Sequence, residues 1–190
     1  MRGKRRERDN HAISEAVQTR RATSADLDAL LADVQAGFDS YATFASAGWH
    51  APYVSVDRDR TRERLTDIQT WALLACASGK PIGHVSFCEA RSRSLSDREA
   101  PDPEREPIAN LAHLWQLFVM PAWWGRGVAP VLHDAAVEEM RVRGYVRARL
   151  YTPSLHARAR RFYERRGWIE ANEEFSERLT LTLAEYRLAL

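Results

Sequence analysis

The spacing of apolar residues in the N-terminal part of the chain predicts one strand followed by one helix. Residues 12–21 fit a strand, and over residues 24–38 leucine, valine and phenylalanine recur at the three- and four-residue intervals of a helix. Thr23 and Asp26 stand where a capping box places its two side chains, with the hydroxyl serving backbone amides and the carboxylate reaching back. The helix is therefore expected to begin directly after Thr23.

The middle of the chain alternates between polar and strongly apolar segments. Residues 38–56 are rich in aromatic side chains but are interrupted by glycine and proline, which indicates a loop or a broken helix. The charged residues 58–67 fit a helix. Two apolar runs, 71–77 and 82–90, flank a Ser-Gly-Lys-Pro turn and predict an antiparallel hairpin. Residues 91–110 hold three prolines and few apolar residues. They predict a long surface loop, which we expect to be mobile without substrate.

The C-terminal part of the chain repeats a strand–helix pattern. Strands are predicted at 111–120 and 145–151, helices at about 129–143 and 156–166, and further strand residues at 168–169 and within 178–190. Gly144 and Gly167 follow the two helices, as is typical of C-caps. The predicted order, β–α–(α)–β–β–β–α–β–α–β, has antiparallel and parallel parts and therefore indicates a mixed α/β (α+β) protein.

Length and composition place this pattern in one domain. The chain has 190 residues, of which 45% are hydrophobic and 28% charged, values typical of a soluble globular protein. One domain of this size removes about 70% of its unfolded surface from water. We therefore assign residues 11–190 to a single domain. The basic residues 1–10 before it have almost no apolar side chains and are expected to form a disordered tail.

Targeting signals, disulfides and metal sites are not expected. No stretch approaches the ~20 apolar residues of a membrane helix, and no apolar run follows the basic N-terminus, so we expect a cytoplasmic protein that binds no membrane. Cys76 and Cys88 lie in strand-like runs, where a thiol is typically a small buried apolar group. Their spacing fits neither a disulfide scaffold nor a structural zinc site.

Positive charge is concentrated in one segment, although the net charge is only +2. Between Arg141 and Arg166 there are nine arginines and a single acidic residue, Glu164. Such a block can face nucleic acid, a phosphorylated cofactor or solvent, and composition does not decide among them.

The strongest local signal for binding is the turn Trp124-Gly-Arg-Gly-Val-Ala129, between a predicted strand and a predicted helix. Glycines there let the backbone turn tightly and approach a ligand, while exposed amides and the helix dipole attract an anion. Pro130 fits the first helical turn, where a missing N–H costs little. The turn is too short for a P-loop and lacks the third glycine of the dinucleotide fingerprint.

Two segments resemble the GNAT N-acetyltransferase superfamily in sequence and in order. One runs from Leu114 to Pro121 and continues into Gly125-Arg-Gly-Val-Ala129, and the other is Ala159-Arg-Arg-Phe-Tyr-Glu-Arg-Arg-Gly-Trp168. The resemblance is close over about residues 110–170 and weaker over most of the chain. It implies a twisted mixed sheet, flanked by helices, whose fourth and fifth strands splay apart. It also implies acetyl-CoA as co-substrate, with the pantetheine arm in that gap, and no metal.

The resemblance assigns cofactor contacts to three places: strand backbone freed by a bulge, the amides of the turn, and the second helix. The residues concerned are Leu117, Phe118, Val119, Trp124, Gly125, Arg126, Gly127, Val128, Ala129, His156, Ala159 and Phe162. Trp124 departs from the family, which prefers Gln or Arg at this position. His156 replaces the family's usual asparagine but can still donate a hydrogen bond to pantetheine.

Two catalytic roles follow from the same resemblance. Tyr163 stands where the family often places a tyrosine that protonates the departing CoA thiolate, and a phenol can do so because the thiolate forms beside it. A protonated amine must first lose a proton. His113 takes the place of the glutamate that often does this, and a histidine pKa suits proton removal near neutrality. His84, Glu89 or a chain of waters are the alternatives for this base.

The leading hypothesis is an acetyl-CoA-dependent N-acetyltransferase in which a primary amine attacks the thioester directly. A non-catalytic acyl-CoA-binding or regulatory module is the alternative. We do not expect nucleic acid as a partner, because the arginine block overlaps the cofactor motif. The acceptor, a small-molecule or peptide amine, stays open. The aromatic residues from Phe38 to Tyr53 either line its pocket or belong to the core, and Asp39, Asp57 and Asp59 are candidates to bind a cation. A monomer or a homodimer is expected.

Overall fold

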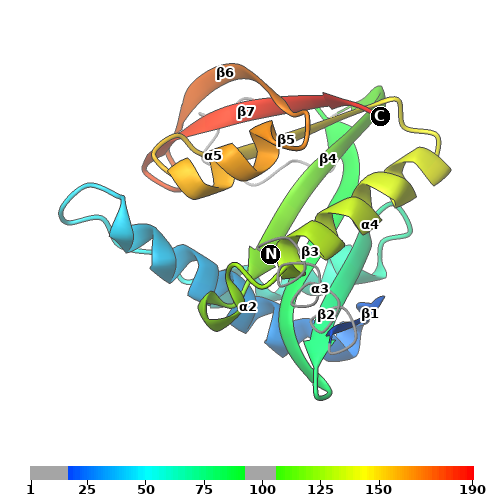
Figure 1. The fold of residues 1–190 in the computed structure, drawn as a ribbon, viewed down its shortest axis with the longest axis horizontal. Coiled ribbons are helices and arrows are strands. Elements are labelled where there is room, and N and C mark those ends of the chain that lie inside the picture. Colours follow the sequence, from blue (N-terminus) through cyan, green and yellow to red (C-terminus); the bar gives the residue numbers. More distant parts are fainter. Residues whose placement is uncertain (1–16, 93–105) are drawn as a thin grey trace, which may run out of the picture.

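The computed structural model describes residues 17–92 and 106–190. Within these ranges one mixed sheet of seven strands, in the order β1-β2-β3-β4-β5-β7-β6, is flanked by four α-helices (Figure 1). The strands are β1 (Val17–Arg21), β2 (Trp71–Ala77), β3 (Lys80–Arg91), β4 (Pro107–Val119), β5 (Arg147–Pro153), β6 (Ile169–Ser176) and β7 (Leu181–Ala189). The helices are α2 (Leu27–Asp39), α3 (Arg58–Thr66), α4 (Val128–Val142) and α5 (Ala157–Glu164), with short 3-10 segments η1 (Ser24–Asp26), η2 (Ser40–Thr43), η3 (Val54–Asp57) and η4 (Pro121–Trp123).

The observed elements follow the predicted ones closely, and the mixed α/β class is confirmed. The main difference concerns the predicted loop 91–110, because residues 107–110 already belong to β4. Pro107 pairs with Arg91 at the first position of the strand, where proline is tolerated. The rest of that loop, residues 93–105, and the tail 1–10 lie outside the described residues, so their predicted disorder and mobility stay predictions.

Helices cover both faces of the sheet. α4 packs against β2, β3 and β4, where Leu132 and Met140 meet Phe87 in the main hydrophobic core. α2 packs against β3 and β4 on the other face, where a smaller cluster joins Leu31 to Phe118. The larger core therefore lies on the α4 face, which α5 also covers through Tyr163.

β4 and β5 separate soon after they meet. They are parallel, yet their pairing covers only residues 111–113 of β4 and 147–149 of β5. Beyond it β4 continues to Val119 and β5 to Pro153, with no ladder pairs between these two described segments. In Figure 1, β5, β6, β7 and α5 accordingly stand at the top, apart from the other strands. The predicted splay of the fourth and fifth strands is confirmed.

A β-bulge at Trp115 changes which side chains of β4 face which helix layer. Leu114 and Gln116 pair with adjacent residues of β3, so Trp115 is the extra residue. Leu114 faces the α4 core before the bulge, and Leu117 faces the same core after it. His113 and Gln116 consequently share the α2 face, although a regular strand would place them on opposite faces.

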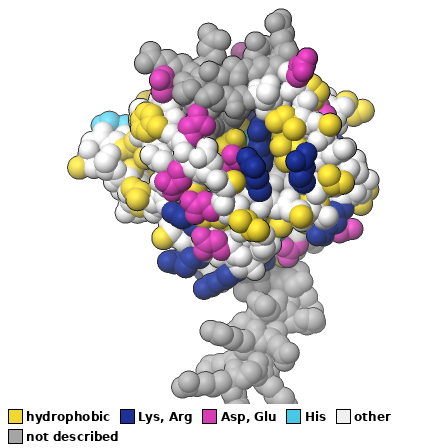
Figure 2. Space-filling view, turned by 90° about the horizontal axis from the view of Figure 1, so that it is seen from above, with side chains coloured by type: hydrophobic (Ala, Val, Ile, Leu, Met, Phe, Trp, Pro, Cys, Tyr) yellow, Lys and Arg dark blue, Asp and Glu magenta, His cyan; other side chains and the backbone are white. Residues whose placement is uncertain are grey.

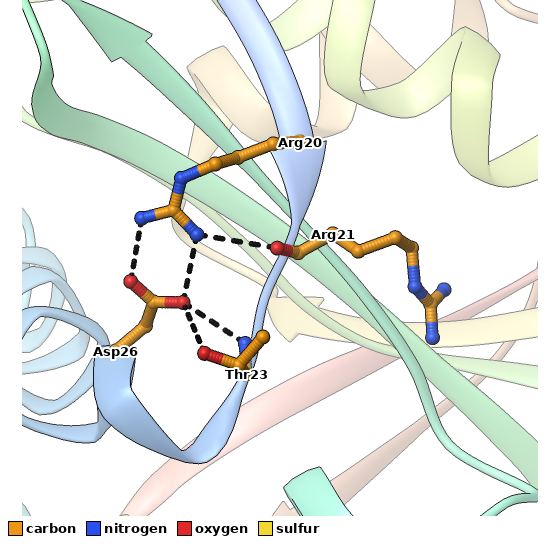
Figure 3. Close-up of polar contacts among 4 residues, drawn as sticks. All are labelled: Arg20, Arg21, Thr23 and Asp26. Carbon is orange, nitrogen blue, oxygen red and sulfur yellow. Dashed lines mark hydrogen bonds and ion pairs between the residues drawn. The ribbon is translucent and has the colours of Figure 1, made fainter.

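A polar junction fixes the start of α2 against β1 (Figure 3). The guanidinium of Arg20 donates to both carboxylate oxygens of Asp26, at 2.6 and 2.8 Å. The carboxylate also accepts from the Thr23 N–H at 2.9 Å and from its hydroxyl at 3.1 Å, so Asp26 reaches back as the capping pattern predicts. The hydrogen bonds from Arg20 lower the pKa of Asp26 to about 2.

The described residues also bear on the expectations about cysteines, membranes and metals. Cys76 is buried, Cys88 is partly buried, and both are free thiols. No helix in residues 17–92 and 106–190 is long and apolar enough to cross a membrane. The same ranges hold no group of three or more His, Cys, Asp and Glu side chains arranged to bind a metal ion.

Candidate active site

A cavity of about 880 Å³ lies where β4 and β5 separate. Its walls come from α2, β4, the turn before α4, β5, α5 and the turn between β6 and β7, so residues from both faces of the sheet contribute. Its volume is in the range of small-molecule binding sites.

The residues predicted for cofactor binding and catalysis meet in this cavity, with one exception. Those that line it are His113, Leu117, Phe118, Val119, Trp124, Gly125, Gly127, Val128, Ala129, His156, Ala159, Phe162 and Tyr163. Arg126 is not among the lining residues, and its guanidinium lies 5.3 Å from the centre of the Trp123 ring. The alternative bases His84 and Glu89 also lie outside the wall.

The turn before α4 offers backbone N–H groups to an anion. Gly125 and Gly127 adopt φ angles of +76° and +86°, the left-handed region that favours glycine. The N–H groups of these glycines and of Val128 and Ala129 have no hydrogen-bond partner in the described part of the chain. Arginines of α5 and the residues just after it stand in the same wall: Arg158, Arg161, Arg165 and Arg166. Free amides at a helix N-terminus, with arginines beside them, fit phosphate groups.

Trp124 joins this turn to the end of β4. Its Nε1–H donates to the Val119 carbonyl at 2.7 Å, and the guanidinium of Arg158 lies 4.7 Å from the ring centre. Because the Met120 N–H donates to Ile82 on β3, the Val119 carbonyl points away from β3, into the gap. The indole thus occupies one of the backbone groups predicted to pair with pantetheine, and it ties the turn to the strand.

Tyr163 presents a protonated hydroxyl to the cavity. The side chain is only 7% exposed and packs edge-on against the rings of Phe162 and Trp168. Among the described residues the hydroxyl has no hydrogen-bond partner. Burial raises the pKa of this phenol well above its usual value, and the nearby Tyr41 adds to the shift. The hydroxyl therefore keeps its proton until a strong base forms beside it.

His156 is neutral in this cavity. It precedes α5 and stacks on Phe44 with ring centres 4.7 Å apart. Burial lowers its pKa to about 4, and the charge of Arg158 contributes. A neutral imidazole has one donor and one acceptor nitrogen, so His156 can donate a hydrogen bond as the family's asparagine would.

His113 lies on the α2 face of β4, away from the turn that precedes α4. It is buried and lines the cavity, and its ring meets that of Tyr151 at 5.6 Å in an edge-on arrangement. The bulge at Trp115 places Gln116 on the same face and in the same wall. This second side of the cavity is where an acceptor can approach the gap.

The aromatic segment after α2 contributes partly to the cavity and partly to packing. Phe38 and Tyr41 line the wall, whereas Tyr53 is 78% exposed. Trp49 donates from Nε1 to the carbonyl of Leu179 at 2.7 Å, which links this segment to the turn between β6 and β7. Both readings of the aromatic residues therefore apply, each to different members.

Of the three acidic residues considered for a cation, only Asp57 lines the cavity. It forms ion pairs with Arg178, which lines the same wall, and with Arg60 at 3.6 Å. Asp39 and Asp59 bond to neighbours on their own helices. Sequence reasoning missed Arg178 because it belongs to a turn far along the chain, and no local motif marks it.

The fold and the cavity define a class before any comparison is made: an α/β protein with a split sheet, whose cavity offers free amides and arginine side chains in the gap. Residues 34–168 match the Acetyltransferase (GNAT) family. The chain belongs to this family, and the resemblance noted in its sequence is confirmed. It is therefore an acetyltransferase by family membership.

Solved structures with the same fold include three acetyltransferases. PaiA N-acetyltransferase from Thermoplasma acidophilum, in complex with coenzyme A, is 17% identical with a TM-score of 0.66 over 90% of this chain and 99% of its own. YncA, a putative acetyltransferase from Salmonella typhimurium with acetyl-CoA, is 20% identical with a TM-score of 0.67 over 92% and 94%. Ribosomal-protein-alanine N-acetyltransferase from Brucella melitensis is 21% identical with a TM-score of 0.68 over 91% and 99%. At these identities the likeness shows the fold. No curated protein matches the chain.

Proposed function

We propose that this protein binds acetyl-CoA and transfers the acetyl group to a primary amine by direct attack of the amine on the thioester. The observation that carries the proposal is a single cavity that holds the unpaired amides of the Gly125–Ala129 turn and the hydroxyl of Tyr163. Family membership and the neighbours solved with coenzyme A or acetyl-CoA support it. A cytoplasmic location and a monomer or homodimer belong to the same proposal.

The residues of the cavity fit acetyl-CoA, which supplies an activated acetyl thioester when bound. The four free amides of the turn before α4 would hold the diphosphate, and the arginines of α5 would complement its charge. The backbone of Leu117 to Val119 would meet pantetheine in the gap, except for the Val119 carbonyl, which Trp124 already occupies. His156 would donate to the same arm from the opposite wall.

Two side chains would move protons. Tyr163 would donate its phenolic proton to the sulfur as the thiolate leaves, and its raised pKa keeps that proton in place beforehand. His113 would take a proton from the amine, because it lines the cavity on the α2 face, whereas His84 and Glu89 do not reach the wall. Holding both substrates in line would supply much of the rate.

A second candidate is a non-catalytic acyl-CoA-binding or regulatory module. The indole of Trp124 favours it, because it takes a β4 carbonyl that a ligand would otherwise meet. The retained Tyr163 favours the enzyme. We propose no nucleic-acid partner, and the pairing of Arg160, one arginine of the basic block, with Glu170 and Glu173 on β6 supports this. Seen from above, acidic side chains lie among the lysine and arginine side chains of this face (Figure 2).

The experiment is a thiol-release assay with acetyl-CoA and a panel of primary amines. We expect the wild-type protein to release CoA with at least one amine, and Tyr163→Phe to lower kcat about 100-fold, the low end for a general acid. Acetyl-CoA affinity should stay near the wild-type value. Tyr145→Phe is the matched control, since this tyrosine packs edge-on against Phe87, away from the cavity.

The outcomes separate the two candidates. Binding of acetyl-CoA without thiol release from any amine would favour the non-catalytic module. Wild-type rates in Tyr163→Phe would make the phenol a packing residue and overturn its role as an acid.

A further inference from the structure

A row of polar side chains runs from α2 along the α2 face of the sheet to the cavity. Asp33 on α2 is 5% exposed, and its Oδ2 lies 2.5 Å from Nδ1 of His84 on β3, which is fully buried. Nε2 of His84 lies 3.2 Å from Oε1 of Gln116 on β4, and Gln116 lines the cavity. The mechanism above uses none of these three side chains, and burying Asp33 and His84 has a cost that a purely apolar contact would avoid.

The hydrogen bonds along this row of side chains define the orientation of the Gln116 amide. A carboxylate only accepts, so Nδ1 of His84 carries a hydrogen toward Asp33. On the other side, Oε1 of Gln116 accepts from the Ser86 hydroxyl at 3.2 Å and faces Nε2 of His84 at the same distance. Nε2 donates to it when His84 carries hydrogen on both ring nitrogens, as an imidazolium paired with the Asp33 carboxylate. The NH₂ group of Gln116 is left with no hydrogen-bond partner in the described residues. Because the side chain stands in the cavity wall, its two N–H donors are available to a ligand there.

We propose that Asp33 and His84 hold the Gln116 amide with its NH₂ group turned into the cavity, where it donates a hydrogen bond to an oxygen of the acceptor. The inference rests on the proposed function and deepens it by naming a substrate class. The preferred acceptor is a primary amine that carries a hydrogen-bond-accepting oxygen close to its nitrogen. Gln116 is then a specificity-determining residue, and Asp33 and His84 are positioning residues.

The place of Gln116 on β4 supports this assignment. The bulge at Trp115 brings its side chain to the same face as His113, the proposed base. A donor beside the base can bind an oxygen of the molecule whose amine the base deprotonates. The aromatic rings of Phe38 and Tyr41 line the same cavity and offer an apolar surface to the rest of the acceptor.

The first test needs no turnover. Nitrogen-15 NMR of histidine-labelled protein near neutral pH reports which ring nitrogens of His84 carry hydrogen, and the spectrum of His84→Gln assigns the signals. The proposal requires hydrogen on both nitrogens, because each faces an oxygen. An Nε2 without hydrogen would mean that His84 accepts from the Gln116 NH₂, so that the amide oxygen faces the cavity. That result would overturn the proposal.

The second test compares two amines that differ by one group: phenylalanine amide and 2-phenylethylamine, which lacks the carboxamide. We expect wild-type protein to favour phenylalanine amide, and Gln116→Leu to lower the ratio of the two kcat/KM values about tenfold, the value of one hydrogen bond. His84→Leu should lower the same ratio, since the amide would lose its orientation. A general structural defect lowers both kcat/KM values and leaves their ratio unchanged.

The outcomes distinguish this inference from the proposed function. Thiol release with no selectivity between the two amines, or with a ratio that survives Gln116→Leu, overturns the inference and leaves the acetyltransferase standing. No thiol release by the wild-type protein with any amine overturns both.

Discussion

The two sides of the cavity are built in different ways. On the α4 side, the turn before α4, Tyr163 and the wall around them come from one continuous stretch of chain, from β4 to the end of α5. On the α2 side, the wall is assembled from α2, η3, β4 and the turn between β6 and β7, which are far apart in the sequence. The first side offers backbone amides to the cavity, and the second offers side chains.

This difference indicates which part of the proposed function depends on the fold and which part depends on individual side chains. Amides at the start of a helix and a gap between two strands persist through many side-chain changes, so the cofactor side can be shared by distant relatives. Gln116 and Arg178 line the other side through their side chains, and we expect single changes there to leave the fold intact. We therefore expect the acceptor side to define what is specific to this protein.

The substitution with the largest expected effect disrupts the α4 side of the cavity. Gly127→Glu places a carboxylate at the proposed phosphate site and forces a left-handed residue, φ +86°, to carry a side chain. We expect acetyl-CoA to raise the melting temperature of the wild-type protein, because a ligand stabilises the state that binds it, and we expect the variant to lose this rise.

The matched control lies at the other end of α4. Gly144 has φ +82°, and a Cβ there would meet nothing within 4 Å. Gly144→Glu carries the same charge and a similar backbone strain away from the cavity, so it should keep the acetyl-CoA effect. Equal loss in both variants would mean that strain, not the phosphate site, explains the result.

The next effect tests the α2 side through the proposed base. His113→Ala should lower kcat about 100-fold near neutral pH and should remove the acidic limb that a histidine base is expected to give the wild-type pH–rate profile. Acetyl-CoA affinity should change little. His50→Ala is the control, because His50 is exposed and lies outside the cavity wall. An unchanged pH–rate profile in His113→Ala would assign proton removal to water.

A smaller effect is expected from the ion pair that joins the two distant segments of the α2 side. Arg178→Ala leaves Asp57 without this partner in the wall and should raise the KM of the acceptor about fivefold, as expected for a partly exposed pair. Arg187→Ala, which breaks an exposed pair with Glu185 on β7, should leave that KM unchanged. A raised KM for acetyl-CoA instead would place Arg178 on the cofactor side.

The last and smallest effect is on stability and concerns the junction that anchors α2. The pKa of Asp26 is lowered from 3.8 to about 2 by Arg20, so this carboxylate stabilises the folded state fully above pH 3.8 and loses that contribution as the pH falls toward 2. Asp26→Asn should therefore reduce the free energy of unfolding at neutral pH by about 1–2 kcal/mol and flatten its acid dependence.

Urea unfolding at several pH values measures this effect. Asp28→Asn is the control, since Asp28 is 80% exposed and its pair with Arg58 lies at the surface. A similar loss in both variants would mean that the junction contributes no more than a surface ion pair.

The α4 side could be predicted from sequence because its signals are local. Glycines between a strand and a helix, and the Phe162-Tyr163 pair before Gly167, can be recognised without knowing the fold. One feature of this side could not be predicted. In the sequence, Trp124 only departs from the family's Gln or Arg, whereas in the structure its indole donates a hydrogen bond to the Val119 carbonyl. Only the three-dimensional path of the turn brings the two groups together.

The α2 side depends on contacts that no local pattern encodes. A one-residue bulge at Trp115 decides that Gln116 shares a face with His113, and the hydrophobic alternation of β4 does not reveal it. The sequence made His84 a candidate base, yet in the structure it is fully buried against Asp33. Predicting these roles requires knowing which helix covers which face of the sheet.

The most direct measurement of the central claim is a calorimetric titration of the wild-type protein with acetyl-CoA. The account predicts saturable binding at one site per chain, with Gly127→Glu silent under the same conditions. Absence of heat with both acetyl-CoA and CoA at high concentration, confirmed by an unchanged melting temperature, would contradict the claim that the gap between β4 and β5 holds this co-substrate.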